Sequence, residues 1–171
     1  MQEEAQSVIN QLKTRITTLS SPLSGTVIPL KDVKDETFAE GYLGEGVAIL
    51  PEDGHVYSPI SGRVVSLFDT KHAVSIQGDN GAEVLIHVGR DTVSLGGRYF
   101  TAFCENGDRV RAGDLLLGFD LDAIDKEGFD LTTPIVIVNS THFDSLEVLK
   151  KESVVAGEPL LRLHEGDKTL L

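Results

Sequence analysis

The chain has 171 residues, a length that suits one domain with a substantial buried core. Its formal net charge of −12 argues against nucleic acid as a partner, because phosphate backbones require clusters of Lys and Arg. This charge favours a basic protein partner or serves only solubility. Cys104 is the one cysteine, so no internal disulfide can form, which fits a reducing cytosol. No apolar stretch approaches the roughly 20 residues that span a bilayer, and no signal peptide opens the chain, so we expect a cytoplasmic protein without membrane insertion.

Residues 1–19 differ in composition from the rest of the chain. They are polar and lack glycine, and their apolar residues recur at helical spacing: Val8, Ile9, Leu12, Ile16 and Leu19. The pattern predicts a marginal amphipathic helix or a linker, with too little positive charge to indicate a membrane surface. We therefore expect the folded domain to occupy residues 20–171.

From Ser21 onward, short apolar runs alternate with turn signals. The turn signals contain Asp-Gly, Asn-Gly or Gly-Gly pairs, which tolerate positive φ, in "EDGHV", "GDNGA", "LGGRY" and "ENGDR". Runs of four to six apolar residues between such turns predict an all-β protein. We expect two short helical pieces, near Leu121–Glu127 and Phe143–Lys150.

Two pairs of segments form a diverged internal repeat. "SPLSGTV" (21–27) and "SPISGRV" (58–64) are identical at five of seven positions, and "VRAGDLL" (110–116) resembles "VVAGEPL" (154–160). A Pro followed by a small residue and Gly suits a strand that turns sharply at a sheet edge or barrel corner. Two copies of each segment predict a pseudo-symmetric antiparallel sandwich or barrel.

Two of the five histidines lie in a predicted hairpin. His72 opens "HAVSIQ", His87 closes "AEVLIH", and "GDNG" between them signals a tight turn. A two-residue turn at Asp79-Asn80, or a four-residue loop, places His72 directly opposite His87 on one face of the hairpin. An Asn80-Gly81 turn would shift this pairing. Within "AEVLIHVG", alternation sends Val84, Ile86 and Val88 to the core and leaves Leu85 on the same face as His87.

Adjacent imidazoles resist double protonation, so at least one of them has a lowered pKa and retains a neutral lone pair. Such a nitrogen can attack phosphorus, accept a proton or bind a metal. Thr70 shares the face of His72, Asp91 follows His87 by four residues, and Gly89 offers backbone groups that would orient a ring. A hydrogen-bonded pair of core histidines is the structural alternative.

A zinc hydrolase on a related duplicated β-scaffold is the alternative enzymatic interpretation. It would need a third protein ligand, and Leu85 stands where an H-x-H motif requires histidine. A serine triad is disfavoured because no serine sits in a nucleophile elbow. A biotinyl or lipoyl carrier is excluded because no lysine occupies the corresponding hairpin.

The segment "GAEVLIHVGRDTV" (81–93) resembles the signature of the glucose family of enzyme IIA of the bacterial phosphoenolpyruvate:sugar phosphotransferase system (PTS), at twelve of thirteen positions. Arg90 departs from it, because the family has an apolar residue there. "FDTKHAVSI" (68–76), "FAEGYLGEGVAILP" (38–51) and "SPISGRV" also resemble this family, so that the resemblance covers roughly residues 20–163.

This resemblance implies an antiparallel β-sandwich with a duplicated hybrid motif. It also implies that His87 accepts a phosphoryl group from the phosphocarrier protein HPr on Nε2 and passes it to a cysteine of enzyme IIB in the IIB/IIC sugar permease. His72 corresponds to the histidine needed for onward transfer, and Thr70 and Asp91 correspond to the remaining polar site residues. No metal or other cofactor is required, and a Gly89 carbonyl on Nδ1 of His87 would fix the tautomer that leaves Nε2 free as the nucleophile.

The resemblance further implies an apolar ring that docks both partners, made of Phe38, Tyr42, Leu43, Phe68, Leu85 and Val93. Asp35 and Asp91 correspond to acidic positions that face a basic residue of HPr, and we expect Arg90 to tune the affinity or association rate there. Family members also bind and inhibit regulatory protein targets when unphosphorylated, and the two histidines can then share zinc with a partner's carboxylate.

Overall fold

The computed structural model describes residues 2–5 and 14–166, of which residues 2–5 are helical. Strands make up most of the remainder: β1 (Thr14–Ser20), β2 (Gly25–Pro29), β3 (Glu45–Pro51), β4 (His55–Tyr57), β5 (Gly62–Leu67), β6 (Ala73–Gly78), β7 (Glu83–His87), β8 (Phe100–Ala102), β9 (Arg109–Val110), β10 (Leu115–Phe119), β11 (Thr133–Ile137), β12 (Ser145–Val148), β13 (Ser153–Val154) and β14 (Pro159–Gly166). The helical pieces are short: η1 (Leu30–Asp32), α2 (Glu36–Ala39), η2 (Thr92–Leu95), α3 (Leu121–Lys126) and η3 (Ser140–His142). None of the helices in these described residues is long and apolar enough to cross a membrane.

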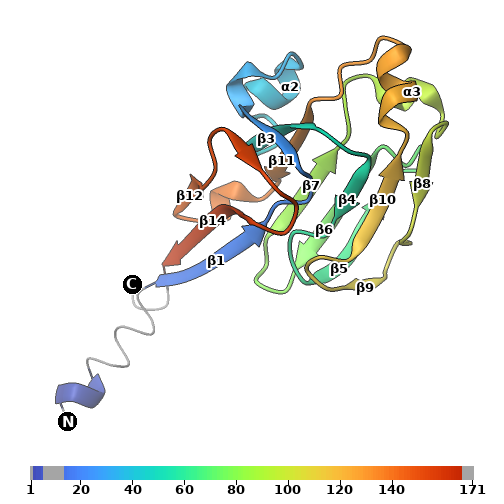
Figure 1. Ribbon diagram of the computed structural model, residues 1–171. Coiled ribbons are helices and arrows are strands. Elements are labelled where there is room, and N and C mark those ends of the chain that lie inside the picture. The colour runs from blue at the N-terminus through green and yellow to red at the C-terminus, as the bar shows by residue number, and fades with distance from the viewer. Residues whose placement is uncertain (1, 6–13, 167–171) are drawn as a thin grey trace.

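The strands form one large sheet and two small ones. The large sheet has the order β13-β2-β3-β11-β7-β6-β5-β9, and the small sheets are β1-β14-β12 and β4-β10-β8. Every strand pair is antiparallel. Figure 1 shows β1-β14-β12 toward the left and β4-β10-β8 toward the right, with α2 and α3 at the end of the molecule toward which β7 runs. The predicted all-β antiparallel sandwich is confirmed.

The topology has an internal two-fold pattern centred on the antiparallel pair β7–β11. On one side of this pair lie β6, β5 and β9, and on the other lie β3, β2 and β13. The small sheets correspond in the same way, β4-β10-β8 to β1-β14-β12. One half is therefore the continuous segment β4 to β10, inserted in the chain between β3 and β11 of the other half.

Equivalent hydrogen bonds recur in the two copies of the repeated segment. Ser21 Oγ donates to Leu23 O at 2.6 Å, and Ser58 Oγ donates to Ile60 O at 2.7 Å. Both serines are buried, so each hydroxyl fixes the turn that leads into its strand. The duplication seen in the sequence is thus a duplication of local structure.

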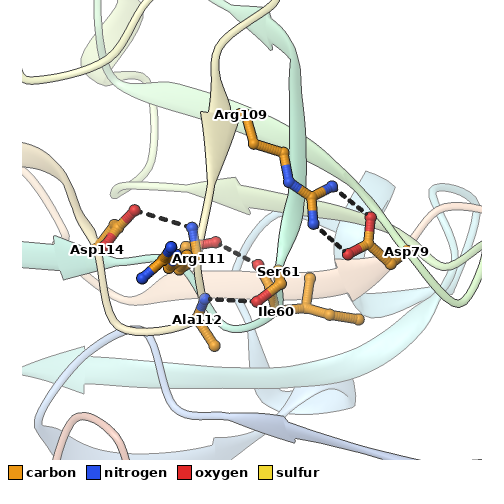
Figure 2. A network of polar contacts seen from close by, with 8 residues as sticks. Ile60, Ser61, Asp79, Arg109, Arg111, Ala112 and Asp114 are labelled. Carbon is orange, nitrogen blue, oxygen red and sulfur yellow. Dashed lines mark hydrogen bonds and ion pairs between the residues drawn. The ribbon is translucent and has the colours of Figure 1, made fainter.

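The second serine of each copy holds the other repeated segment in place. Ser24 Oγ accepts a hydrogen bond from Ala156 N at 2.8 Å, and Ser61 Oγ accepts one from Ala112 N at 3.1 Å. Figure 2 shows the second of these contacts beside the ion pair between Arg109 and Asp79. These bonds explain why the "SP-SG" and "V-AG" segments recur as a set.

The glycine of each copy is required by close approach of the neighbouring strand. A Cβ on Gly25 would lie 2.0 Å from Leu50 O, and one on Gly62 would lie 2.0 Å from Gln77 O. Both contacts involve backbone, which cannot move aside without breaking the sheet.

The core lies between the sheets; β11 is buried along its whole length, whereas β7 buries alternate residues. Val84 and Ile86 on β7 are fully buried, as is Val88 just after it, whereas Leu85 and His87 are half-buried on the opposite face. The predicted alternation of "AEVLIHVG" between the core face and the face of His87 is therefore confirmed.

The predicted register of the histidine hairpin is wrong by one residue. Gln77 pairs with Glu83, and Ala73, rather than His72, pairs with His87. The cause is a three-residue loop, in which Gly81 adopts a φ of +93° and Gly78 N donates to Ala82 O at 2.7 Å. None of the three turns considered from the sequence has this geometry.

One of the two expected helices forms. Asp120 Oδ1 accepts a hydrogen bond from Ala123 N at 3.1 Å and so begins α3, close to the predicted residues 121–127. The helix expected at residues 143–150 is wrong, because strand β12 lies at the centre of this segment and pairs with β14. Tertiary pairing here overrides a local helical pattern.

Strand β1 also corrects the predicted start of the folded part. Thr14–Ser20 is not a helix or linker but pairs with β14, and Leu19 is buried in the core while Ile16 is exposed. The run is rich in β-branched residues, which favour a strand once a partner strand is available. Val8, Ile9 and Leu12 lie outside the described residues.

Candidate functional site

His87 ends strand β7, and its ring is held by the turn that follows. Its Nδ1 lies 2.9 Å from Gly89 O. A carbonyl oxygen can only accept, so Nδ1 carries the proton and Nε2 keeps its lone pair. The backbone of Gly89 has a φ of +76°, and a Cβ there would lie 2.7 Å from Thr92 Cγ2. The predicted Gly89 carbonyl contact is therefore present, and the tight turn explains the glycine.

His72 reaches His87 by a route different from the predicted cross-strand pair. It lies just before β6, after Lys71, which adopts a left-handed φ of 60°. His72 O accepts a hydrogen bond from Val88 N at 2.7 Å, which holds this irregular segment against the end of β7. The two imidazole centroids are 4.9 Å apart, with the rings at 85°. The sequence thus predicted the juxtaposition correctly although its register was wrong.

Thr70 contacts His72. Its Oγ1 lies 2.7 Å from His72 Nδ1. When the hydroxyl donates, the proton of His72 sits on Nε2. From the sequence, the Thr70 hydroxyl is expected to donate to phosphoryl oxygens. In the structure this hydroxyl is hydrogen-bonded to the ring of His72 instead.

Both imidazoles are less basic than a free histidine. Burial, with a smaller contribution from the neighbouring His87, lowers the pKa of His72 to about 4. Burial likewise lowers the pKa of His87, opposed by its hydrogen bond to Gly89 and by the charges of Asp35 and Asp91. Two neutral rings therefore face each other at neutral pH, and burial, rather than the like-charge repulsion argued from the sequence, is the main cause.

Apolar side chains surround the two rings. Phe38, from α2, is 4% exposed, and its ring centroid lies 5.2 Å from that of His87. Phe68 packs against the edge of His72 at 5.4 Å and is 40% exposed. Phe38 belongs to the β2–β3 connection, so the site combines both halves of the duplication.

The remaining residues of the predicted ring differ in exposure. Tyr42 and Val93 are 77% and 54% exposed, and Leu43 and Leu85 are half-buried. Large exposed apolar side chains are typical of a protein-binding surface. Their role in docking stays a prediction.

Asp35 and Asp91 provide the negative charges that act on His87. Asp35 Oδ1 accepts a hydrogen bond from Thr37 N at 3.0 Å and caps α2. Asp91 adopts a left-handed φ of 59° at the start of η2, and its side chain is 83% exposed. Both carboxylates therefore belong to the surroundings of the two rings.

The residues present offer little to a metal ion. The described part of the chain contains no group of three or more His, Cys, Asp or Glu side chains placed to hold one. Two imidazoles supply two ligands, whereas a catalytic zinc site needs three from the protein. Any zinc shared at this site would need a further ligand from a partner.

Sequence reasoning missed two residues that shape the turn after His87. Thr92 is fully buried and donates through Oγ1 to Val88 O, and Asp130 O accepts the hydrogen bond of Arg90 N at 2.8 Å. Thr92 stood in the quoted signature. Asp130 is forty residues from Arg90 and precedes β11, so only the pairing of β11 with β7 brings it here.

Comparison with known proteins agrees with this geometry. The chain is 51% identical over 159 residues to a beta-glucoside-specific EIIBCA component of the PTS from Dickeya chrysanthemi, which covers 93% of this chain and 25% of that protein. It is 41% identical to a glucose-specific EIIA component from Oceanobacillus iheyensis, covering 88% of this chain and 91% of that protein.

A solved structure shows the same fold. The glucose permease IIA from Mycoplasma capricolum matches with a TM-score of 0.82 and 38% identity, covering 86% of this chain and 96% of that one. The sequence profile of the phosphoenolpyruvate-dependent sugar phosphotransferase system EIIA 1 family matches residues 17–143. The chain belongs to this EIIA family.

Proposed function

We propose that this chain is a phosphoryl carrier in PTS sugar uptake, working in the cytoplasm. It accepts a phosphoryl group from phosphorylated HPr on Nε2 of His87 and passes it to a cysteine of enzyme IIB. One observation carries the proposal: Nδ1 of His87 donates to Gly89 O, so Nε2 presents a lone pair beside a second neutral imidazole.

The transfer balances without a metal. The lone pair of His87 Nε2 forms a bond to phosphorus while the bond between phosphorus and the donor's histidine nitrogen breaks. The product ring keeps its Nδ1 proton and gains positive character, which the Gly89 carbonyl stabilises directly. Asp35 and Asp91 favour the same charge through their fields.

His72 acts on the phosphoryl group rather than on the proton of His87. With the Thr70 hydroxyl donating to Nδ1, His72 carries its proton on Nε2, and its ring centroid lies 4.9 Å from that of His87. This N–H can donate to a phosphoryl oxygen and stabilise charge as the group leaves for the cysteine of enzyme IIB. Thr70 is then a positioning residue for His72.

The surrounding surface suits two successive partners. An exposed apolar ring with a polar centre permits docking that must reverse before the second partner can bind. The acidic residues Asp35 and Asp91 favour a basic donor. This chain spans a quarter of the length of its beta-glucoside relative, so we assign sugar selection to permease components outside the region compared.

Phosphorylation assays test the proposal. Incubation with phosphoenolpyruvate, enzyme I and HPr should add one acid-labile phosphoryl group to the wild-type chain. His87→Gln should abolish uptake, and His72→Gln should permit uptake but block discharge to enzyme IIB. His55→Gln, at an exposed histidine of β4, is the matched control and should behave as wild type.

Two results would overturn this function. Phosphoryl uptake that survives His87→Gln would place the acceptor elsewhere. Stoichiometric, tightly held zinc in the purified protein would favour the hydrolase alternative, which neither the site nor the relatives support.

A further inference from the structure

The turn that leads from η2 into β8 contains a strained residue. Tyr99 adopts a φ of 74°, in the left-handed region that a residue with a Cβ occupies only at a cost in free energy. Gly96 and Gly97 before it have φ values of 61° and 89°, which glycine adopts readily. Tyr99 therefore depends on contacts with other parts of the fold to stay in this conformation.

Contacts with both ends of α3 hold Tyr99 in place. Its carbonyl oxygen accepts a hydrogen bond at 2.9 Å from the backbone N–H of Asp120, the residue that begins the helix. Its hydroxyl donates at 3.2 Å to Oε1 of Glu127, the residue that ends the helix. The position of Tyr99 is therefore fixed relative to both ends of α3.

Arg98 binds the same carboxylate as Tyr99. Its Nη2 donates to both oxygens of Glu127 at 2.9 Å, and its guanidinium carbon lies 5.0 Å from the centroid of the Tyr99 ring. The Glu127 side chain is 34% exposed. One partly buried carboxylate thus joins two consecutive side chains of the turn, and we call Arg98, Tyr99 and Glu127 the α3 clamp.

The clamped turn lies against the segment that carries Thr70. A Cβ on Gly97 would lie 3.7 Å from Thr70 O and 3.9 Å from Thr70 Cα, which is ordinary van der Waals contact. Thr70 is half-buried, although Asp69 and Lys71 on either side of it are exposed. The Thr70 hydroxyl lies 2.7 Å from His72 Nδ1, so the turn supports the backbone from which this hydroxyl reaches the ring.

We infer that the α3 clamp positions Thr70 and, through it, the proton of His72. The inference rests on the proposed function, in which the Nε2 proton of His72 helps the phosphoryl group to leave His87. The three clamp residues are positioning residues, because they act on the rings through Gly97 and Thr70. Loosening the clamp lets the turn move, which weakens the hydrogen bond to His72 Nδ1 and mixes the two tautomers of this ring.

The test is Glu127→Gln, which removes the charge on which the clamp contacts converge. Discharge of phosphorylated His87 to enzyme IIB should slow about two- to fivefold, the range expected for loss of a partly exposed ion pair. Uptake from phosphorylated HPr should change less than about 1.5-fold, because Gly89 O sets the tautomer of His87. Nitrogen NMR should show mixed tautomers for His72 and an unchanged His87.

Asp79→Asn is the matched control. It breaks a comparable paired contact between a carboxylate and Arg109, on the loop at the opposite end of β6 from His72 (Figure 2). Both half-reactions and the nitrogen spectra of both imidazoles should stay as in the wild type. A slower discharge in Asp79→Asn equal to that in Glu127→Gln would assign the effect to general loosening and overturn the inference.

A double variant tests the route through Thr70. Thr70→Val already lacks the hydroxyl, so adding Glu127→Gln should not slow discharge further. Additive slowing, equal slowing of uptake and discharge, or an unchanged His72 tautomer in Glu127→Gln overturns the inference alone. A wild-type chain that accepts no phosphoryl group overturns the proposed function, whereas the nitrogen spectra of unphosphorylated Glu127→Gln judge the clamp independently of it.

Discussion

Replacing Thr70 by Val tests whether the tautomer of His72 controls onward transfer. Val keeps the shape of Thr but removes the hydroxyl that lies 2.7 Å from His72 Nδ1 in a half-buried position. Without this donor, His72 Nε2 no longer carries the proton in every molecule. We therefore expect discharge of phosphorylated His87 to enzyme IIB to slow, while the lone pair on His87 that accepts the group is unaffected.

The size of the effect follows from the bond that is lost. A neutral hydrogen bond contributes about 0.5–1.5 kcal/mol, which corresponds to a rate change of about 2- to 12-fold. We expect discharge to slow within this range and uptake from phosphorylated HPr to change less than about twofold. Thr70→Ser restores the hydroxyl and should recover most of the discharge rate.

Rapid-quench measurement of the two half-reactions separates these effects. Nitrogen NMR of the imidazoles provides a readout independent of activity: His72 should change from one tautomer to a mixture, whereas His87 should not change. An unaltered discharge rate, or equal slowing of uptake and discharge, would refute the role assigned to Thr70.

Three further predictions concern stability, each measured by urea denaturation. Gly89→Ala should lower the free energy of unfolding by about 2–4 kcal/mol, because φ is +76° and the added Cβ meets Thr92. Gly128→Ala, where φ is +91° but the space around the Cβ is open, should lower it by only about 1 kcal/mol. Equal losses would contradict the crowding argument. The pKa of His72 is lowered to about 4 in the folded protein, so the unfolded protein binds this proton at a higher pH. The free energy of unfolding should therefore be full above about pH 6.5 and fall by about 1–3 kcal/mol toward pH 4. An equally steep fall in His72→Gln would assign this loss to other groups. Ser21→Ala and Ser58→Ala should each cost about 1 kcal/mol, since their hydrogen bonds are equivalent, and a difference above about 1 kcal/mol would argue against equivalent halves.

Much of the site could be predicted because its signals are local. The period-two alternation in "AEVLIHVG" placed Val84 and Ile86 in the core and His87 on the other face, and the strand has this arrangement. The two SP-SG segments predicted a duplication, which the equivalent serine hydrogen bonds of the two copies confirm. Such features depend on side-chain spacing along one short segment, which the sequence displays directly.

Other features depend on geometry that a linear pattern does not contain. The hairpin register depends on whether Gly81 belongs to the loop. Because Gly81 adopts a positive φ within a three-residue loop, His87 pairs with Ala73 rather than with His72. The segment 14–19 carries helical spacing, yet it is a strand because β14 lies beside it to supply hydrogen bonds. In this second case strand pairing overrides a weak local preference.

The sequence by itself determined the all-β class, the duplication and the two histidines that belong together. Only the tertiary structure decided how they meet, because the left-handed Lys71 brings His72 to His87. It also decided that Asp130 and the loop after α3 complete the turn around Arg90. These contacts join segments far apart in the chain, so their energies depend on the folded arrangement rather than on neighbours in sequence.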